Sequence, residues 1–403
     1  MYARLCFMRI AGYQIDFSVN MKSTDVNIKD FKNITLFPGL NSLRFIAAFL
    51  VLMHHSETIK AKNGIDNFEW LGLFRNGGNA VVFFFVLSGF LITYLLMRER
   101  SKTGTISIRN FYLKRVLRIW PLYFLLVLIG TIALPFAFSV LKIDYDMPYT
   151  LSETWFYFVF FLPSLVTFFY GHHFLEPLWS IGVEEVFYLI WAPLIKFSRR
   201  NILVLLLGVV FVKAALSLLG IFVFTNELYN YLTLTFSFEA MAIGGLGAWF
   251  IYMKGDLINR HFIFKTPVQI FVFSLTVLYL LFHSNIDNEI WRLFFKTPIV
   301  SSWVVELLFL YIIICVSSVD HSVVRLRSRF LSYLGEISYG IYMYQMLVIF
   351  ATILFLKDTL LAMTFPFNQI VYYLVVFVLI IFVSAVSKVL FEDYFLKLKG
   401  KLK

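Results

Sequence analysis

Long, continuous runs of apolar residues recur along this chain, and they restrict its fold more than any other feature. Most runs are close to 20 residues long, the length that a helix needs to cross the hydrocarbon core of a bilayer. Backbone groups must be hydrogen-bonded within lipid, so only helices or a closed barrel can span it. Because the runs are continuous rather than alternating, they predict an all-α polytopic membrane protein.

Ten runs are candidate transmembrane spans. They cover about residues 40–60, 79–97, 119–138, 178–196, 201–224, 231–253, 267–284, 298–318, 337–356 and 368–391. A further apolar run, about 154–170, is interrupted by Pro163. We expect this run to be re-entrant or interfacial rather than a span.

The polar segments between the runs predict the orientation of the chain. Lysine and arginine are enriched on the cytoplasmic side of membrane proteins, so the basic loop 98–118 is expected inside. Segment 139–153 carries three acidic residues and one lysine, so it is expected outside. Ten spans with both termini in the cytoplasm place every basic loop inside and every acidic or neutral turn outside, provided that 154–170 does not cross the membrane.

Three regions follow from this topology. Residues 1–35 are predicted to be a cytoplasmic N-terminal extension, with Met21 as an alternative start. Residues 36–392 form the transmembrane domain. Residues 393–403 form a basic cytoplasmic tail.

The composition agrees with a membrane location. Of the 403 residues, 60% are hydrophobic and only 15% are charged, which is more apolar surface than a soluble domain can bury. The net charge of +11 comes largely from short inter-helix loops, so we expect no nucleic-acid partner. Cys6 and Cys315 are far apart, and we expect neither a disulfide nor a metal site.

The first apolar run contains ionisable residues at unusual depth. Arg44 and His55 are eleven residues apart, about 16 Å along a helix. Such groups usually face a cavity or a partner rather than lipid. His54 and His55 are either a helix-end pair satisfied by water or include a general base or transient acyl acceptor. Adjacent helical residues point about 100° apart, so at most one of the two faces a shared pocket.

Two other segments carry charges next to apolar residues. Arg115 and Arg118 lie on one helix face, where they could anchor the helix at the membrane surface or bind a phosphate-bearing ligand. Glu184 and Glu185 lie within an apolar, aromatic span. They could pair with a basic residue of another helix or line a functional cavity. One of them could orient and polarise His55.

Weaker signals occur elsewhere. Ser88 and Gly89 lie in mid-span, where the glycine allows close approach of another helix. Ser338, Tyr339, Tyr342 and Gln345 follow one late helix. Glu239 and Glu306 are isolated acids within spans. His172 and His173 lie in an outer loop, where we expect them to be solvated; the alternative is that they line the entrance for the acceptor.

Taken together and in this order, these segments resemble acyltransferase family 3, the bacterial integral-membrane O-acyltransferases. The resemblance covers about residues 40–390. The matching positions are Arg44, His55, Ser88, Gly89, Arg115, Arg118, Pro121, Trp179, Ser180, Glu184, Glu185, Gly335, Ser338, Tyr339 and Tyr342. Gln345 departs from the pattern, because many relatives have His there; a hydrogen-bonding role stays open for it. Since the sequence ends soon after its last span, it is similar to members without a C-terminal SGNH-type hydrolase domain.

The resemblance implies a reaction and assigns roles to these residues. An acyl-CoA, usually acetyl-CoA, would bind from the cytosol, with Arg44, Arg115 and Arg118 near its phosphates and no permanently bound cofactor. The thioester would reach His55, which would hold the acetyl group or act as a base, supported by Glu184 or Glu185. The weaker substrate-binding candidates are Ser88, Trp179, Ser180, Ser338, Tyr339 and Tyr342.

The resemblance also implies the acceptor and the location. The acceptor would be a hydroxyl of a surface glycan or lipid-linked saccharide, giving an O-acetylated lipopolysaccharide or exopolysaccharide at the bacterial inner membrane. Three alternatives stay open: a transporter or flippase of a polysaccharide pathway, a non-catalytic subunit of an export system, and an acyltransferase that uses succinyl groups or a small-molecule acceptor.

Overall fold

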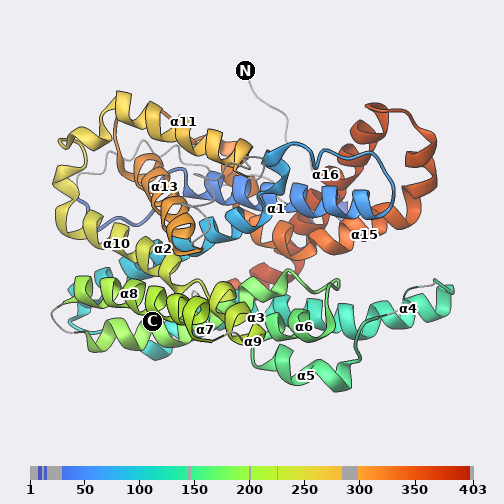
Figure 1. Cartoon of the computed structure of the whole chain (residues 1–403), viewed down its shortest axis with the longest axis horizontal. Helices are drawn as coiled ribbons and strands as arrows, with labels where there is room; N and C mark the ends of the chain where they lie inside the picture. Colours follow the sequence, from blue (N-terminus) through green and yellow to red (C-terminus); the bar gives the residue numbers. More distant parts are fainter. Residues whose placement is uncertain are drawn as a thin grey trace.

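The structure is a computed structural model that describes residues 8–10, 13–15, 30–143, 145, 147–198, 201–224, 226–283 and 298–399. It is almost entirely helical (Figure 1). Two short antiparallel strands, β1 (Met8–Ile10) and β2 (Tyr13–Ile15), lie in the N-terminal extension. The remainder of the predicted extension before residue 30 lies outside the described residues.

Long helices form the body of the protein. They are α1 (Leu40–Lys62), α2 (Gly77–Thr103), α3 (Ile108–Leu128), α7 (Leu178–Phe197), α8 (Ile202–Phe222), α10 (Phe238–Lys254), α11 (Thr266–Phe282), α13 (Pro298–Ser318), α15 (Ser338–Ala362) and α16 (Phe367–Ser387). The shorter helices are α4 (Leu134–Leu141), α5 (Leu151–Val159), α6 (Pro163–Tyr170), α9 (Glu227–Thr235), α14 (Arg329–Glu336) and α17 (Asp393–Lys399). Single π-helical turns join α3 to α4 and α16 to α17.

The predicted all-α polytopic fold is confirmed. Within the described residues, eight helical stretches are long and apolar enough to cross a membrane. Two other predicted spans correspond to α1, which contains several charged and polar residues, and to α11, which has 17 residues. The predicted interfacial run 154–170 forms α5 and α6, of nine and eight residues. At 1.5 Å per residue, neither helix can span a bilayer.

Some predicted boundaries were wrong. The basic segment 98–118 is mostly helical, because α2 continues to Thr103 and α3 begins at Ile108. Gly104, with a φ of 75°, ends α2 in a left-handed conformation. The run 231–253 is interrupted at residues 236–237 between α9 and α10, and α17 extends the last helix into the predicted tail. Basic composition predicts the side of the membrane but does not distinguish loop from helix.

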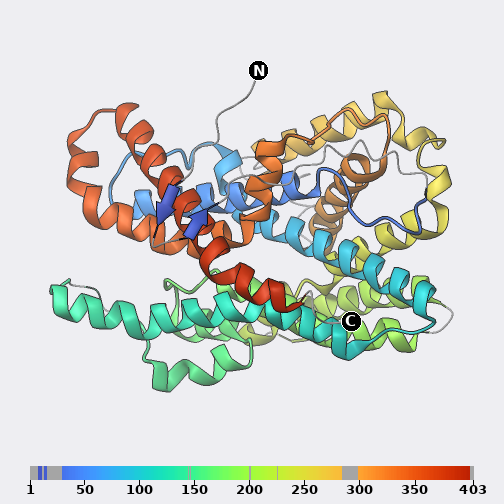
Figure 2. The same cartoon turned by 180° about the vertical axis from the view of Figure 1, so that it is seen from behind.

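The helices form two groups, which the two views show one above the other (Figures 1 and 2). One group contains α1, α2, α10, α11, α13, α15 and α16, and the other contains α3 to α9. The C-terminal helix α17 reaches across to α3 (Figure 2). A site between the groups therefore takes residues from helices that are distant in the sequence.

Close packing of α2 on α10 confirms the role predicted for Gly89. A Cβ atom at Gly89 would lie 1.9 Å from the backbone oxygen of Met241, and one at Gly244 would lie 1.9 Å from that of Val86. The two helices thus meet backbone to backbone. This contact fixes α2, which carries Ser88 on the neighbouring position.

Candidate active site

A cavity of about 270 Å³ lies between the two groups of helices. Its walls come from α1, α2, α3, α7 and α15 and from residues 34–37 before α1. Nine of the predicted site residues line it: Arg44, Ser88, Arg115, Arg118, Ser180, Glu184, Ser338, Tyr339 and Tyr342. Trp179, Glu185 and His55 are not among its lining residues.

Three arginines gather in one part of this cavity, called here the arginine end. Arg44 donates a hydrogen bond from Nη1 to Oδ1 of Asn41 at 2.9 Å. Arg115 lies against aromatic rings, with its guanidinium carbon 5.3 Å from the ring centre of Tyr188 and its Nε without a hydrogen-bond partner. Among the described residues, no carboxylate lies within ion-pair distance of Arg44, Arg115 or Arg118. Three guanidinium groups around one cavity favour a multiply charged anion such as a phosphate-bearing ligand.

Glu184 lies beside the arginine end and is held by two hydroxyl groups. Ser88 of α2 and Tyr188 of α7 both donate to its Oε1. Tyr188 follows Glu184 by four residues and therefore lies on the same helix face. The positive charges of Arg44 and Arg115 are the electrostatic neighbours of this carboxylate. Glu184 thus connects the arginine end to α2.

Glu185 points to a different neighbour. Its Oε2 accepts a hydrogen bond from the indole Nε1 of Trp120 at 2.9 Å, and its Oε1 is buried without a partner. Because adjacent helical residues point about 100° apart, Glu184 and Glu185 cannot both face the cavity. Of the two, Glu184 does.

The late motif of α14 and α15 packs next to the arginine end. A Cβ atom at Gly335 would lie 2.0 Å from the backbone oxygen of Asn41, so only glycine allows α14 to approach the start of α1 this closely. Ser338 donates to the Gly335 carbonyl at 2.8 Å. Tyr339 donates to the Ile119 carbonyl of α3 at 3.0 Å. The motif therefore joins α1 to α3.

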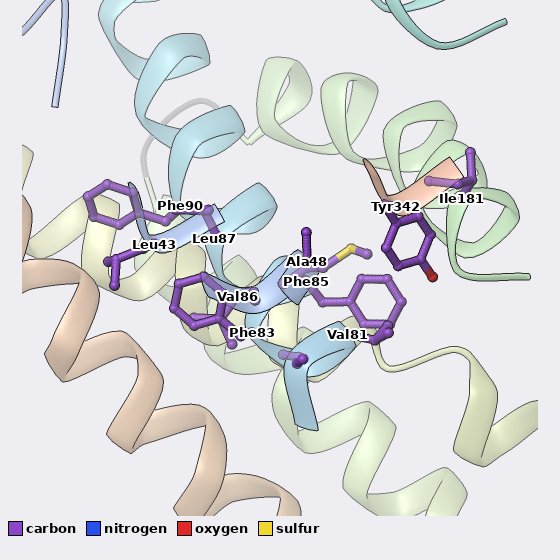
Figure 3. Close-up of a cluster of buried hydrophobic side chains, with 14 of the residues drawn as sticks. Leu43, Ala48, Val81, Phe83, Phe85, Val86, Leu87, Phe90, Ile181 and Tyr342 are labelled. Carbon is purple, nitrogen blue, oxygen red and sulfur yellow. The ribbon is translucent and has the colours of Figure 1, made fainter. Parts of the chain in front are cut away.

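Tyr342 and Ser180 form the other end of the cavity. Their hydroxyl oxygens are 2.6 Å apart, and Tyr342 also donates to the Pro177 carbonyl at 3.1 Å. Figure 3 shows Tyr342 and Ile181 next to Phe85 and Val81 of α2. Gln345 is buried and donates to the Tyr342 carbonyl at 2.9 Å.

Trp179 lies outside the cavity and packs behind it. Its ring is edge-on to that of Phe85, with ring centres 6.1 Å apart. Phe85 itself lines the cavity. The contact of Trp179 with the cavity is therefore indirect.

His55 lies beyond the Tyr342 end of the cavity. Gly77 at the start of α2 contacts His54 late in α1, whereas Phe37, just before α1, contacts Tyr94 late in α2. The helices α1 and α2 therefore run antiparallel. The cavity extends along α2 from Leu95 to Val81, about 21 Å at 1.5 Å per residue. Val81 is four residues, or about 6 Å, from Gly77. The half-buried His55 is thus about one helical turn beyond the cavity.

The two adjacent histidines have different surroundings. The Nδ1 of His54 is 3.1 Å from the carbonyl oxygen of Phe74, so His54 is engaged by the backbone. The electrostatic neighbours of His55 are His54, Lys62 and His172. In the described part of the chain, neither Glu184 nor Glu185 hydrogen-bonds His55. Their predicted support of this histidine stays a prediction without a contact behind it.

The outer-loop histidines were predicted to be solvated, and for His173 this was wrong. His172 is exposed and lies 2.8 Å from Glu176, whereas His173 is 4% exposed. Tyr149 donates to Nδ1 of His173 at 2.9 Å. Burial, together with the nearby His172, lowers the pKa of His173 to about 3. This loop histidine is therefore neutral and structural.

Sequence reasoning missed two residues of the arginine end. Tyr188 lies four residues after Glu184, and Asn41 lies three residues before Arg44. Each spacing places the two residues of a pair on one helix face. Helix-face spacing from the predicted site residues could therefore have identified both.

Comparison with known proteins assigns the fold to a family. A family model described as an acyltransferase domain matches residues 37–389. A protein of Staphylococcus aureus (strain COL), provisionally named an O-acetyltransferase, is 31% identical over 166 residues, which is 40% of this chain and 24% of that protein. The peptidoglycan O-acetyltransferase OatA of Listeria monocytogenes is 30% identical over 158 residues, 38% of this chain and 23% of that protein.

A third relative gives a longer match. The O-acetyltransferase OatA of Staphylococcus aureus (strain NCTC 8325) is 30% identical over 196 residues, 44% of this chain and 30% of that protein. The chain thus matches less than a third of the length of these curated relatives. No solved structure matches it significantly.

Proposed function

This chain belongs to acyltransferase family 3, whose domain matches residues 37–389, and from that membership we propose that it transfers an acyl group from a thioester donor to a hydroxyl group of a glycan. Its helices make it a multi-pass membrane protein. We place it in the bacterial plasma membrane.

One observation carries the proposal. The cavity holds three arginines without ion-pair partners among the described residues, near the level of Ser88, and from there it continues about 10 Å along α2 to Val81, toward His55. Its walls between the ends are mostly apolar. Such a cavity suits a ligand that has an anionic head group, a long thin chain and a reactive group at the other end of that chain.

Acyl-CoA is such a ligand, and acetyl-CoA is the proposed donor. Its phosphates would contact Arg44, Arg115 and Arg118, because guanidinium groups bind phosphate oxygens with paired hydrogen bonds. Its pantetheine arm would follow the apolar wall. The thioester would then approach Tyr342 and Ser180, whose hydroxyl groups lie at the far end.

His55 would carry out the transfer by one of two routes. As a general base, it would take the proton of the acceptor hydroxyl while the oxygen attacks the thioester carbonyl. The C–S bond breaks, a C–O ester bond forms, and the thiolate takes up the proton. As a nucleophile, its imidazole nitrogen would carry the acyl group first and release it to the acceptor oxygen. Both routes need the cavity to extend by about one helical turn when the donor is bound.

The Listeria relative is named for peptidoglycan O-acetylation, and we propose a cell-envelope glycan as the acceptor class here. A peptidoglycan, a lipopolysaccharide and an exopolysaccharide all offer suitable hydroxyl groups. A succinyl donor or a small-molecule acceptor would use the same arginine end and the same histidine.

The experiment uses membranes that contain the wild-type chain, His55→Ala or the matched control His54→Ala. Each receives acetyl-CoA labelled in its acetyl group, and label is measured in separated glycan and lipid fractions. We expect transfer by wild type and His54→Ala and none by His55→Ala at equal expression. Equal transfer by all three would refute the role of His55. Labelled succinyl-CoA transferred in place of acetyl-CoA would reassign the donor.

A further inference from the structure

A second group of buried charges lies outside the acyl-transfer cavity. Lys213 of α8, Glu239 of α10 and Glu306 of α13 come from three neighbouring helices. We call them the lysine–glutamate cluster. None of the three lines the acyl-transfer cavity.

Lys213 and Glu239 form an ion pair in the protein interior. The Nζ of Lys213 lies 3.2 Å from Oε2 of Glu239 and 2.5 Å from the carbonyl oxygen of Thr233. Lys213 and Glu239 are each 8% exposed. The lysine charge is therefore already engaged by one carboxylate and one carbonyl.

Glu306 has no such partner. It is 1% exposed, and neither of its carboxylate oxygens has a hydrogen-bond partner among the described residues. Its titratable neighbours are Glu239 and Lys213. Ser302 and Trp303 precede Glu306 by four and three residues on α13, so they lie on the same helix face. Those two residues line a small cavity that Lys213 and Glu239 share.

The charges of the cluster do not balance. One lysine and two carboxylates leave one negative charge within the membrane-spanning part of the protein. An uncompensated carboxylate in the membrane-spanning part is costly, and such groups usually pair with a positive charge or become neutral. The small cavity has a volume of about 30 Å³, which admits a water molecule or a small ion. Besides Lys213 and Glu239, no titratable side chain lines it in the described part of the chain.

From these contacts we propose that the lysine–glutamate cluster binds one exchangeable positive charge at Glu306, beside the Lys213–Glu239 ion pair. The ligand is a small monovalent cation, either a proton or a sodium ion. A proton would make the Glu306 carboxyl group neutral. A sodium ion would be held by carboxylate oxygens and by the serine hydroxyl groups that line the cavity. This site is independent of the proposed acyl transfer.

The charge balance predicts that replacing either glutamate removes the need for the extra positive charge, whereas replacing the lysine increases it. Glu306→Gln or Glu239→Gln leaves one lysine and one carboxylate, so neither variant needs the extra charge. Lys213→Gln leaves two carboxylates and needs a second positive charge. Ser317→Ala is the matched control, because it removes a buried hydroxyl of α13 that bonds the Ile313 carbonyl. All substitutions are close in size to the original residues.

Two measurements on the purified full chain distinguish the two ligands. The first compares melting temperatures in sodium chloride and in an equal concentration of a chloride salt of a large organic cation. The second records, in sodium-free buffer at pH 7, the infrared carbonyl band of protonated carboxyl groups. Size-exclusion profiles show which variants remain folded.

A sodium-dependent rise in melting temperature in wild type and Ser317→Ala, absent from Glu306→Gln and Glu239→Gln, would identify sodium. No sodium effect, with one protonated carboxyl group lost in both glutamine variants and one gained in Lys213→Gln, would identify the proton. The proposal is overturned if wild type shows no sodium effect and its infrared band is the same as in Glu306→Gln. It is also overturned if a sodium effect persists unchanged in that variant.

Discussion

Replacing Tyr188 by phenylalanine tests whether the arginine end depends on the bond that Tyr188 makes with Glu184. The Tyr188 hydroxyl donates to Oε1 of Glu184, and its ring faces the Arg115 guanidinium at 5.3 Å. Phenylalanine keeps the ring and its contact with Arg115. Only the hydrogen bond is removed.

The expected loss follows from the chemistry of that bond. A hydrogen bond to a charged group contributes about 1.5–3 kcal/mol. Since about 1.4 kcal/mol corresponds to a factor of ten, kcat/KM should fall by about tenfold to about 150-fold. Ser88 still holds the same carboxylate oxygen, so the lower part of the range is expected. Because Glu184 lies beside Arg44 and Arg115, the change should appear mainly as a higher KM for the acyl donor.

The assay measures acetyl transfer at varied acetyl-CoA concentrations, so that kcat and KM are obtained separately. Tyr112→Phe is the matched control. The Tyr112 hydroxyl of α3 donates to the Leu189 carbonyl of α7 at 2.6 Å, but Tyr112 does not line the cavity. If Tyr188→Phe has the KM of wild type, or if both variants raise KM equally, the proposed role of Glu184 at the arginine end is refuted.

Three further predictions concern stability, measured as the melting temperature of purified protein. Gly89→Ala should destabilise the protein by about 1–3 kcal/mol, because the added carbon would lie 1.9 Å from a backbone oxygen of α10, whereas Gly78→Ala, which meets open space, should not. Lys60→Met should cost about 3–5 kcal/mol, since it leaves the fully buried Glu57, 3.0 Å away, without its ion-pair partner; adding Glu57→Gln should recover much of the loss, and no recovery would contradict this reasoning. Stability should also fall by about 1.4 kcal/mol per pH unit as the pH is lowered from 6.5 toward 3, because in this range the unfolded chain takes up a proton while the buried His173, with its pKa lowered to about 3, does not. His173→Gln should reduce this slope, and an unchanged slope would assign the acid sensitivity to other groups.

The sequence predicts the long helices well, because their signal is local. Twenty-residue apolar runs predict α7, α8 and α16 to within a few residues. The interruption at Pro163 predicts that α5 and α6 do not span the membrane. Gly89 predicts a close helix contact, although the sequence does not reveal that α10 is the partner.

The candidate site could be predicted as a set of residues but not as a geometry. Unusual polar residues within apolar helices identify Arg44, Ser88 and Glu184, all of which line one cavity. Which of Glu184 and Glu185 faces it depends on the rotation of α7, which is set by its neighbours. The Lys213–Glu239 ion pair joins two helices that are 26 positions apart at these residues. No local pattern predicts such a contact.

The most direct test of the central claim separates donor binding from transfer. Purified wild type, His55→Ala and Arg118→Gln are compared for equilibrium binding of labelled acetyl-CoA and for transfer of its acetyl group. If the donor binds at the arginine end and reacts near His55, His55→Ala binds acetyl-CoA with the Kd of wild type and transfers nothing, whereas Arg118→Gln binds it more weakly. Full donor binding by Arg118→Gln, together with transfer by His55→Ala, would contradict the account.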